Sequence, residues 1–254
     1  MPFGSRRPVP GSRGWRDALT EFRFPVAALV LASVVGGLVD AYALIRYRVF
    51  VANQSGNVVH VGMGLGGEFA DWPVAAASIA GVLIGAALGT VLRWRARPGR
   101  ISPPARQLTA ALLAVATWAL TDALLDAGAH DAGDRALLAV LGAAVTGLLA
   151  VVFFRVAGVT VVTTYQSTTV VDLAKGLVGW LHRRAGRWAW PWVSAVIGLA
   201  SYAAGGWLGT RLLRPQPATF VLTAGIIVVL LLTVRAYRVP APVSPSRRPP
   251  SALR

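Results

Sequence analysis

The chain has 254 residues, of which 55% are hydrophobic and only 14% charged, and its mean hydropathy is +0.59. A soluble domain usually has about a quarter of its residues charged, so this composition indicates a polytopic membrane protein. The absence of cysteine excludes disulfides and thiolate metal sites. The net charge of +15 comes almost entirely from arginines that lie between apolar segments, a pattern typical of proteins oriented by a lipid bilayer rather than of proteins that bind nucleic acid.

Both ends of the chain are polar and basic. Residues 1–23 and 238–254 are rich in Pro, Ser, Gly and Arg, so we expect two disordered cytoplasmic tails. Ala41-Tyr42-Ala43 imitates a signal-peptide cleavage site, but the apolar segment before it is too long for a signal peptide. We therefore expect an uncleaved first membrane helix.

Six segments approach the length of about 20 mostly apolar residues that a membrane helix needs. They are residues 24–45, 73–93, 107–129, 136–154, 191–213 and 218–237. Two more apolar segments, 49–67 and 159–181, are interrupted by Asn, Gln, Ser and Thr. We predict that both re-enter, leaving the membrane on the face they entered, because the arginine-rich segments and both tails then lie in the cytoplasm. A plasma-membrane protein with eight full crossings stays open as the alternative.

The two polar segments also share a sequence. QSGNVVH (54–60) aligns with QSTTVVD (166–172), and LGTVLR (88–93) aligns with LGTRLLR (208–214). Several short matches in the same order indicate an internal repeat. Because each copy holds three full spans, an odd number, the second must be inverted relative to the first. We predict an all-α protein made of two inverted repeats, residues 24–129 and 130–237, each with three spans and one broken or re-entrant polar segment.

A candidate binding site follows from these segments. Each begins with β-branched residues that favour an extended backbone and continues into a short helix, whose free N–H groups suit an anion or a polar neutral solute. The alternative is that the polar side chains only cap helices and join spans. The predicted substrate-binding residues are Asn53, Gln54, Ser55, Gly56, Asn57, His60, Thr163, Thr164, Gln166, Ser167, Thr168 and Thr169.

Two carboxylates are candidates for coupling transport to protons. Asp40 lies within the first span, where an ionisable residue indicates function. The alternative is an ion pair of Asp40 with Arg46 or Arg48. Asp172 aligns with His60 in the repeat and stands three residues before Lys175, so an internal ion pair is its alternative role.

The sequence carries no catalytic pattern. It has no P-loop, no Gly-x-Ser-x-Gly, no His-Glu-x-x-His and no metal-ligand spacing. Asp122 and Asp126 lie four residues apart near the outer end of the third full span, where we expect a solvated rim. We expect no enzyme activity, no cofactor and no metal.

Small residues recur every four positions in two helices. Such stripes let helices pack closely, either inside one chain or between two chains. A homo-oligomer that uses the first stripe is one expectation. The stripes are Gly81, Gly85 and Gly89, and Ser201, Gly205 and Gly209.

Motifs in both halves resemble the YoaK family of bacterial integral membrane proteins, a family of unknown function. The family's Gly-x-x-Asp-Ala stretch corresponds to Gly37-Leu38-Val39-Asp40-Ala41, and its Phe-x-x-x-x-Thr-Gly-Asn motif to Phe50 followed by Ser55-Gly56-Asn57. Thr163 and Thr164 supply the Thr-Thr counterpart in the second half. Serine replaces the usual threonine at position 55 and keeps the hydroxyl. The resemblance implies a bacterial inner-membrane location but no substrate.

The combination of an inverted repeat with a polar, broken segment in each half is typical of transporters. We predict a secondary transporter or channel-like permease for a small polar or anionic solute. The alternative is a membrane scaffold or interaction protein in which the same residues only hold helices together.

Overall fold

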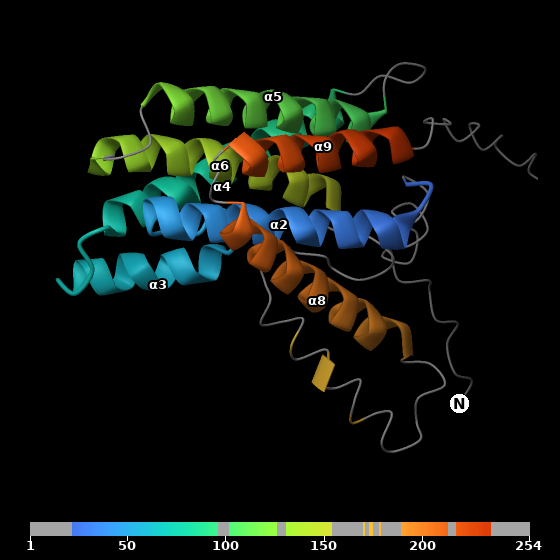
Figure 1. Ribbon diagram of the computed structural model, residues 1–254, viewed down its shortest axis with the longest axis horizontal. Helices are drawn as coiled ribbons and strands as arrows, with labels where there is room; N and C mark the ends of the chain where they lie inside the picture. Colours follow the sequence, from blue (N-terminus) through green and yellow to red (C-terminus); the bar gives the residue numbers. More distant parts are fainter. Residues whose placement is uncertain are drawn as a thin grey trace, which may run out of the picture.

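The computed structural model describes residues 22–95, 102–125, 131–153, 189–212 and 217–234, and residues 170, 173, 174 and 178 singly. Within these ranges the chain forms seven helices and no strand (Figure 1). Their bounds are α2 Pro25–Tyr47, α3 Gln54–Leu65, α4 Trp72–Trp94, α5 Pro103–Leu124, α6 Ala132–Phe153, α8 Ala189–Arg211 and α9 Pro217–Thr233.

Six of these helices coincide with the six predicted spans. Five have the length and composition needed to cross a membrane, while α9 is a shorter apolar helix of 17 residues. Proline stands in the first turn of α2, α4 and α5, where its missing N–H removes no helical hydrogen bond and its fixed φ favours the helix. The all-helical membrane class is therefore confirmed.

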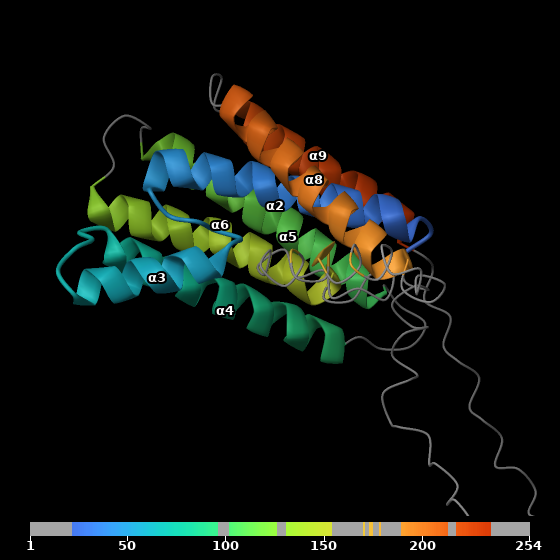
Figure 2. The ribbon, with the colours of Figure 1, turned by 90° about the horizontal axis from the view of Figure 1, so that it is seen from below.

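The helices run back and forth between the two ends of one bundle (Figures 1 and 2). Phe22, before α2, forms an isolated bridge with Val234, after α9, and the Arg23 N–H donates to the Thr233 carbonyl at 2.8 Å. The first and last described residues therefore meet at one end of the bundle. That placement requires an even number of passes between them.

Charge differs between the two ends. The end at which α2 begins, here the basic end, has four described arginines and no described carboxylate: Arg23, Arg93, Arg95 and Arg106. The opposite end, here the mixed end, also has four described arginines, but with five carboxylates: Glu68, Asp71, Asp122, Asp131 and Asp134. This asymmetry is the one expected if the basic end is cytoplasmic.

The first glycine stripe packs inside the chain. A Cβ atom added at Gly81 or Gly85 of α4 would overlap the backbone of α6, at Val140 and Ala144 respectively. In return, a Cβ at Gly147 of α6 would overlap the backbone of α4. The stripe is thus occupied by α6, and a homo-oligomer would have to use another surface.

The second stripe packs in the same way between α8 and α2. A Cβ at Gly205 would overlap the backbone of Val34, and one at Gly37 would overlap that of Tyr202. Gly37 is 110 residues before Gly147, and Tyr202 is 120 residues after Val82, the residue that Gly147 meets. One close-packed helix pair therefore occurs twice, with α2 in the place of α6 and α8 in the place of α4.

The close approach of α4 and α6 can be tested with Gly85→Ala. Its new methyl group has no room beside Ala144, so we expect the free energy of unfolding to fall by about 1–3 kcal/mol. Gly225→Ala in α9 is the matched control, since nothing lies within 4 Å of its Cβ position. Thermal unfolding in detergent measures both. Equal stability of the two variants would contradict the close packing.

Candidate functional site

The segment after α2 turns back into the bundle. Arg48 adopts a left-handed conformation, with φ of 61°, and ends the helix. The following residues run back beside α2, and α3 then returns to the mixed end from a point about halfway along the bundle (Figures 1 and 2). Residues 50–53 form the tip of this path, and the tip contacts Asp40. Asp40 lies seven residues before the end of α2, or about 10 Å at the helical rise of ~1.5 Å per residue. This path has the re-entrant geometry predicted for residues 49–67.

Asp40 holds the tip of this re-entrant hairpin. Its carboxylate accepts hydrogen bonds from three successive backbone N–H groups, of Val51 at 2.7 Å, Ala52 at 2.6 Å and Asn53 at 2.9 Å. The Tyr202 hydroxyl of α8 donates to the same carboxylate. Asp40 is only 3% exposed, and these four donors are the partners that the structure gives it, in place of the predicted Arg46 or Arg48. The carboxylate thus satisfies non-helical backbone N–H groups that apolar surroundings could not.

Asn57 holds the other side of the tip. Its Oδ1 accepts the Phe50 N–H at 3.0 Å, and its Nδ2 donates to the Phe50 carbonyl at 2.6 Å and to Ser78 Oγ of α4 at 3.1 Å. Thr146 of α6 adds a hydroxyl that donates to the Val51 carbonyl at 2.5 Å. Since Asn57 is fully buried, its amide serves the hairpin backbone rather than a solvent-facing surface.

Asn53, Gln54 and Ser55 form the start of α3. The Gln54 amide donates to the Val51 carbonyl at 3.0 Å, and the Ser55 hydroxyl donates to Asn53 Oδ1 at 2.7 Å. Ser55 is exposed, Asn53 and Gln54 are half-buried, and the Asn53 side chain makes no capping hydrogen bond to the helix. The first N–H groups of α3 therefore lie beside an exposed hydroxyl at about half the depth of the bundle.

Gly56 and His60 face aromatic rings. The ring of Phe50 covers Gly56 so closely that a Cβ there would lie 2.7 Å from it. The His60 ring stacks on Phe69, with centroids 4.3 Å apart, and more distantly on Phe50. His60 thus has the packing role considered for it, although its Nδ1 is buried without a hydrogen-bond partner.

The predicted residues of the second polar segment cannot be placed, because they lie outside the described residues. They are Thr163, Thr164, Gln166, Ser167, Thr168, Thr169 and Asp172, together with Lys175.

The prediction of a solvated rim at Asp122 is wrong. Asp122 is 2% exposed and accepts the hydroxyls of Tyr42 at 2.7 Å and Tyr47 at 2.6 Å. The Trp118 indole donates to the Tyr47 hydroxyl at 3.2 Å, and Phe220 of α9 stacks edge-on against Trp118. This network fixes the last turn of α2, from which the hairpin departs. Asp126 lies outside the described residues.

The position of Asp122 near the end of a span predicted exposure to solvent, and no local sequence pattern identified its partners. The usable signal was the presence of two tyrosines on the last turns of an apolar helix. A buried hydroxyl needs a partner, and an acid on another apolar helix is a good one.

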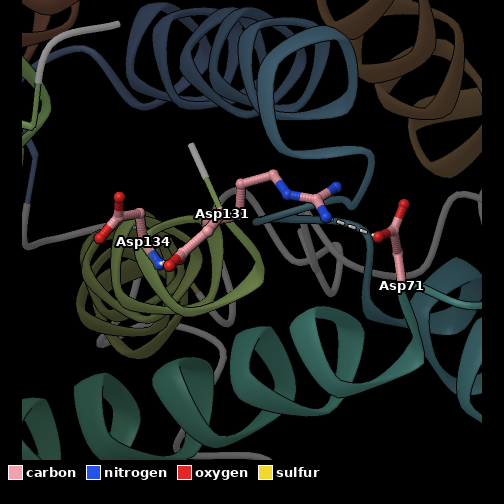
Figure 3. Close-up of polar contacts among 4 residues, drawn as sticks. Asp71, Asp131 and Asp134 are labelled. Carbon is pink, nitrogen blue, oxygen red and sulfur yellow. Dashed lines mark hydrogen bonds and ion pairs between the residues drawn. The ribbon is translucent and has the colours of Figure 1, made fainter. Parts of the chain in front are cut away.

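An ion pair connects the start of α4 to α6 at the mixed end (Figure 3). Arg135 donates to Asp71, which precedes α4, at 2.7 Å, and Asp131 accepts the Asp134 N–H at 2.8 Å. Partly exposed pairs of this kind contribute about 1 kcal/mol or less, so the pair orients α4 and α6 more than it stabilises them. Among the described residues, no three His, Asp or Glu side chains are grouped to hold a metal.

The role of Asn57 can be tested by comparing Asn57→Ala with Ser55→Ala. The first variant leaves the buried Phe50 N–H without its acceptor and the Phe50 carbonyl with Ser78 alone, which we expect to lower the free energy of unfolding by about 1–3 kcal/mol. The second removes an exposed hydroxyl and should change it by less than about 0.5 kcal/mol. Hydrogen exchange of residues 49–57 and thermal unfolding measure the difference. Similar effects of both variants would count against the Asn57 clamp.

The contribution of the Asp122 network to stability can be tested separately. Asp122→Asn replaces one acceptor oxygen with an amide donor that faces a tyrosine hydroxyl, so we expect a loss of about 1–3 kcal/mol. Glu68→Gln, at an exposed position of the same end, is the control and should be near neutral. An Asp122→Asn protein as stable as this control would show that the network contributes little.

Comparison with known proteins gives a family and no function. No curated protein and no solved structure matched the chain. A family model described as "Protein of unknown function (DUF1275)" matches residues 28–234, which include every helix described above except the first three residues of α2. The chain therefore belongs to the DUF1275 family of proteins of unknown function.

Proposed function

We propose that this protein is a secondary transporter or channel-like permease for a small polar or anionic solute, and not an enzyme. The observation that carries the proposal is the polar hairpin, whose tip lies about halfway through an apolar bundle. Non-helical backbone at membrane depth is tolerated where protein surrounds it or where it lines a water-filled cavity. In transporters, such broken segments are where solutes bind.

The start of α3 supplies the chemistry for a solute. Ser55 is exposed, Asn53 and Gln54 are half-buried, and the first N–H groups of α3 point toward the tip. A helix start attracts anions and polar acceptor groups through these N–H groups and the helix dipole. The site residues of the second segment, from Thr163 to Asp172, belong to the proposal on the strength of the sequence repeat alone.

We also propose that the two halves are inverted repeats. The matched glycine contacts of the α4–α6 and α2–α8 pairs support this, since they agree with constant spacings of 110 and 120 residues. Under this proposal, the second polar segment reaches the centre from the basic end, opposite to the first. The motif Gly37 to Ala41 and the hairpin motif likewise support placing the protein with the YoaK family.

The membrane orientation is part of the proposal. The basic end, where the described chain begins and ends, is assigned to the cytoplasm of a bacterium because arginine without acid collects there. Both tails are then cytoplasmic, and the hairpin opens to the outside.

One observation favours the alternative of a scaffold or interaction protein. The hydrogen-bonding groups of Asp40 and Asn57 are already bonded to the hairpin backbone and to neighbouring helices. In a scaffold, the tip would be dry and closed by side chains, whereas a permease requires water to reach it.

Thiol labelling separates the two functions, and the chain has no native cysteine to remove. Under the proposal, Ser55→Cys reacts with a membrane-impermeant thiol reagent from the face on which Glu68→Cys reacts. Arg95→Cys, at the basic end, reacts from the opposite face. Ala111→Cys in α5 is the buried control, because Ala111 is fully enclosed and should not react. A folded Ser55→Cys protein that reacts from neither face would favour the scaffold.

A further inference from the structure

Three backbone donors and one hydroxyl converge on a single carboxylate at the centre of the bundle. The N–H groups of Val51, Ala52 and Asn53 and the hydroxyl of Tyr202 all point to Asp40. Successive backbone N–H groups that face one point form an anion-binding concavity known as a nest. In this structure the nest is filled by an acid of the chain itself.

The occupant can leave the nest without unfolding the hairpin completely. Phe50, the residue before the nest, is held by Asn57 and Ser78, and Val51 is also held through its carbonyl by Thr146. These contacts do not involve Asp40. The donors therefore keep an anchor of their own on α4 and α6, while the carboxylate comes from α2.

Protonation is the chemical change that would release the carboxylate. An ionised carboxylate offers acceptor sites on both oxygens, whereas a carboxylic acid carries a hydroxyl donor and fewer acceptor sites. The Asn53 N–H and the Tyr202 hydroxyl share Oδ2 of Asp40, so a proton on that oxygen takes an acceptor site away from these two donors. Buried donors left without an acceptor are costly, so a second anion would then be favoured at the nest.

Resting on the proposed permease function, we propose that the nest of Val51, Ala52 and Asn53, with the Tyr202 hydroxyl, binds a small monovalent oxyanion. The anion takes the place of the Asp40 carboxylate when Asp40 is protonated. One proton and one anion enter together, so the net charge at the site does not change. The substrate class is accordingly an anion of carboxylate size, and transport is electroneutral proton–anion symport.

The groups around Asp40 support this charge balance. Tyr202 is the titratable partner from α8, and α6 presents the uncharged hydroxyl of Thr146 to the hairpin. On α2 itself, the charge of Arg46 acts on Tyr42, which belongs to the Asp122 network. Phe220 of α9 packs against the same tyrosine ring. From α3, His60 stacks on Phe69. Among the contacts of the described residues, nothing cationic touches Asp40, so two negative charges at the nest would repel each other uncompensated.

The first test measures nitrate binding to the purified full chain in detergent as a function of pH. Nitrate is planar and monovalent, and it does not take up a proton between pH 5 and 8. Because one proton is bound with each anion, nitrate affinity should fall about ten-fold per pH unit wherever Asp40 is ionised. Tyr202→Phe removes one of the four donors and should weaken binding roughly three- to ten-fold. Asp122→Asn is the matched control and should leave the pH dependence unchanged.

The second test is chemical rescue of Asp40→Ala by formate, which resembles the missing carboxylate. Formate should raise the Tm of this variant at pH 7, and Tyr202→Phe should reduce the rescue. Formate should not raise the Tm of Asp122→Ala, because this variant removes a buried carboxylate that lies outside the nest. If Asp40→Ala does not fold, the nitrate series on wild type and Tyr202→Phe decides alone.

Two results would overturn the inference. One is nitrate affinity that is absent or independent of pH in wild type, and the other is equal formate rescue of Asp40→Ala and Asp122→Ala. These outcomes are distinct from failure of the permease proposal. Nitrate binding with an unlabelled Ser55→Cys would leave an anion site in a protein that does not transport, whereas labelling without nitrate binding would leave a permease for another solute.

Discussion

The structure depends on one constraint, that backbone N–H and C=O groups in an apolar environment must find partners within the protein. The spans satisfy it with helical hydrogen bonds, but residues 49–53 leave the helix and cannot. Side chains from α2, α3, α4 and α6 meet the deficit, through Asp40, Asn57, Ser78 and Thr146. The polar residues that looked out of place in a membrane sequence are therefore the condition for the hairpin to exist.

The contacts that match between the two halves concern helix packing. The two glycine-bearing pairs match contact by contact at spacings of 110 and 120 residues. Asn57 aligns with the polar Thr169 in the sequence repeat, but at the spacings of the helix pairs four other polar residues around the hairpin have no polar counterpart. Asp40, Ser78, Thr146 and Tyr202 correspond to Ala150, Gly198, Gly36 and Val82. The close-packed pairs thus have matching contacts, whereas these four residues align with Ala, Gly or Val at the same spacings.

Much of the fold could be predicted from the sequence because it follows from local properties. Hydropathy located the six apolar helices, and arginine placement favoured the re-entrant path of the first polar segment. Asn57 and Asp40 also stand out in apolar surroundings, but the sequence predicted them as solute-binding and proton-coupling residues, and their bonds to the hairpin tip emerged only from the structure. Their partners could not be predicted, because Tyr202 is 162 positions from Asp40 and Tyr42 is 80 positions from Asp122. Such pairings depend on helix packing, which a single sequence does not specify.

Under the proposed exchange at Asp40, one buried polar residue has both a structural and a functional role. A donor set held open for a substrate would be destabilising in its absence, since unpaired N–H groups in hydrocarbon cost several kcal/mol each. An internal carboxylate removes that penalty and keeps the donors oriented, so that a competing anion meets a preorganised site. The same exchange makes stability of the empty protein and affinity for the anion depend on one group. Asp40 is that group because it accepts the three N–H groups of the nest, while the hairpin is also anchored on α4 and α6.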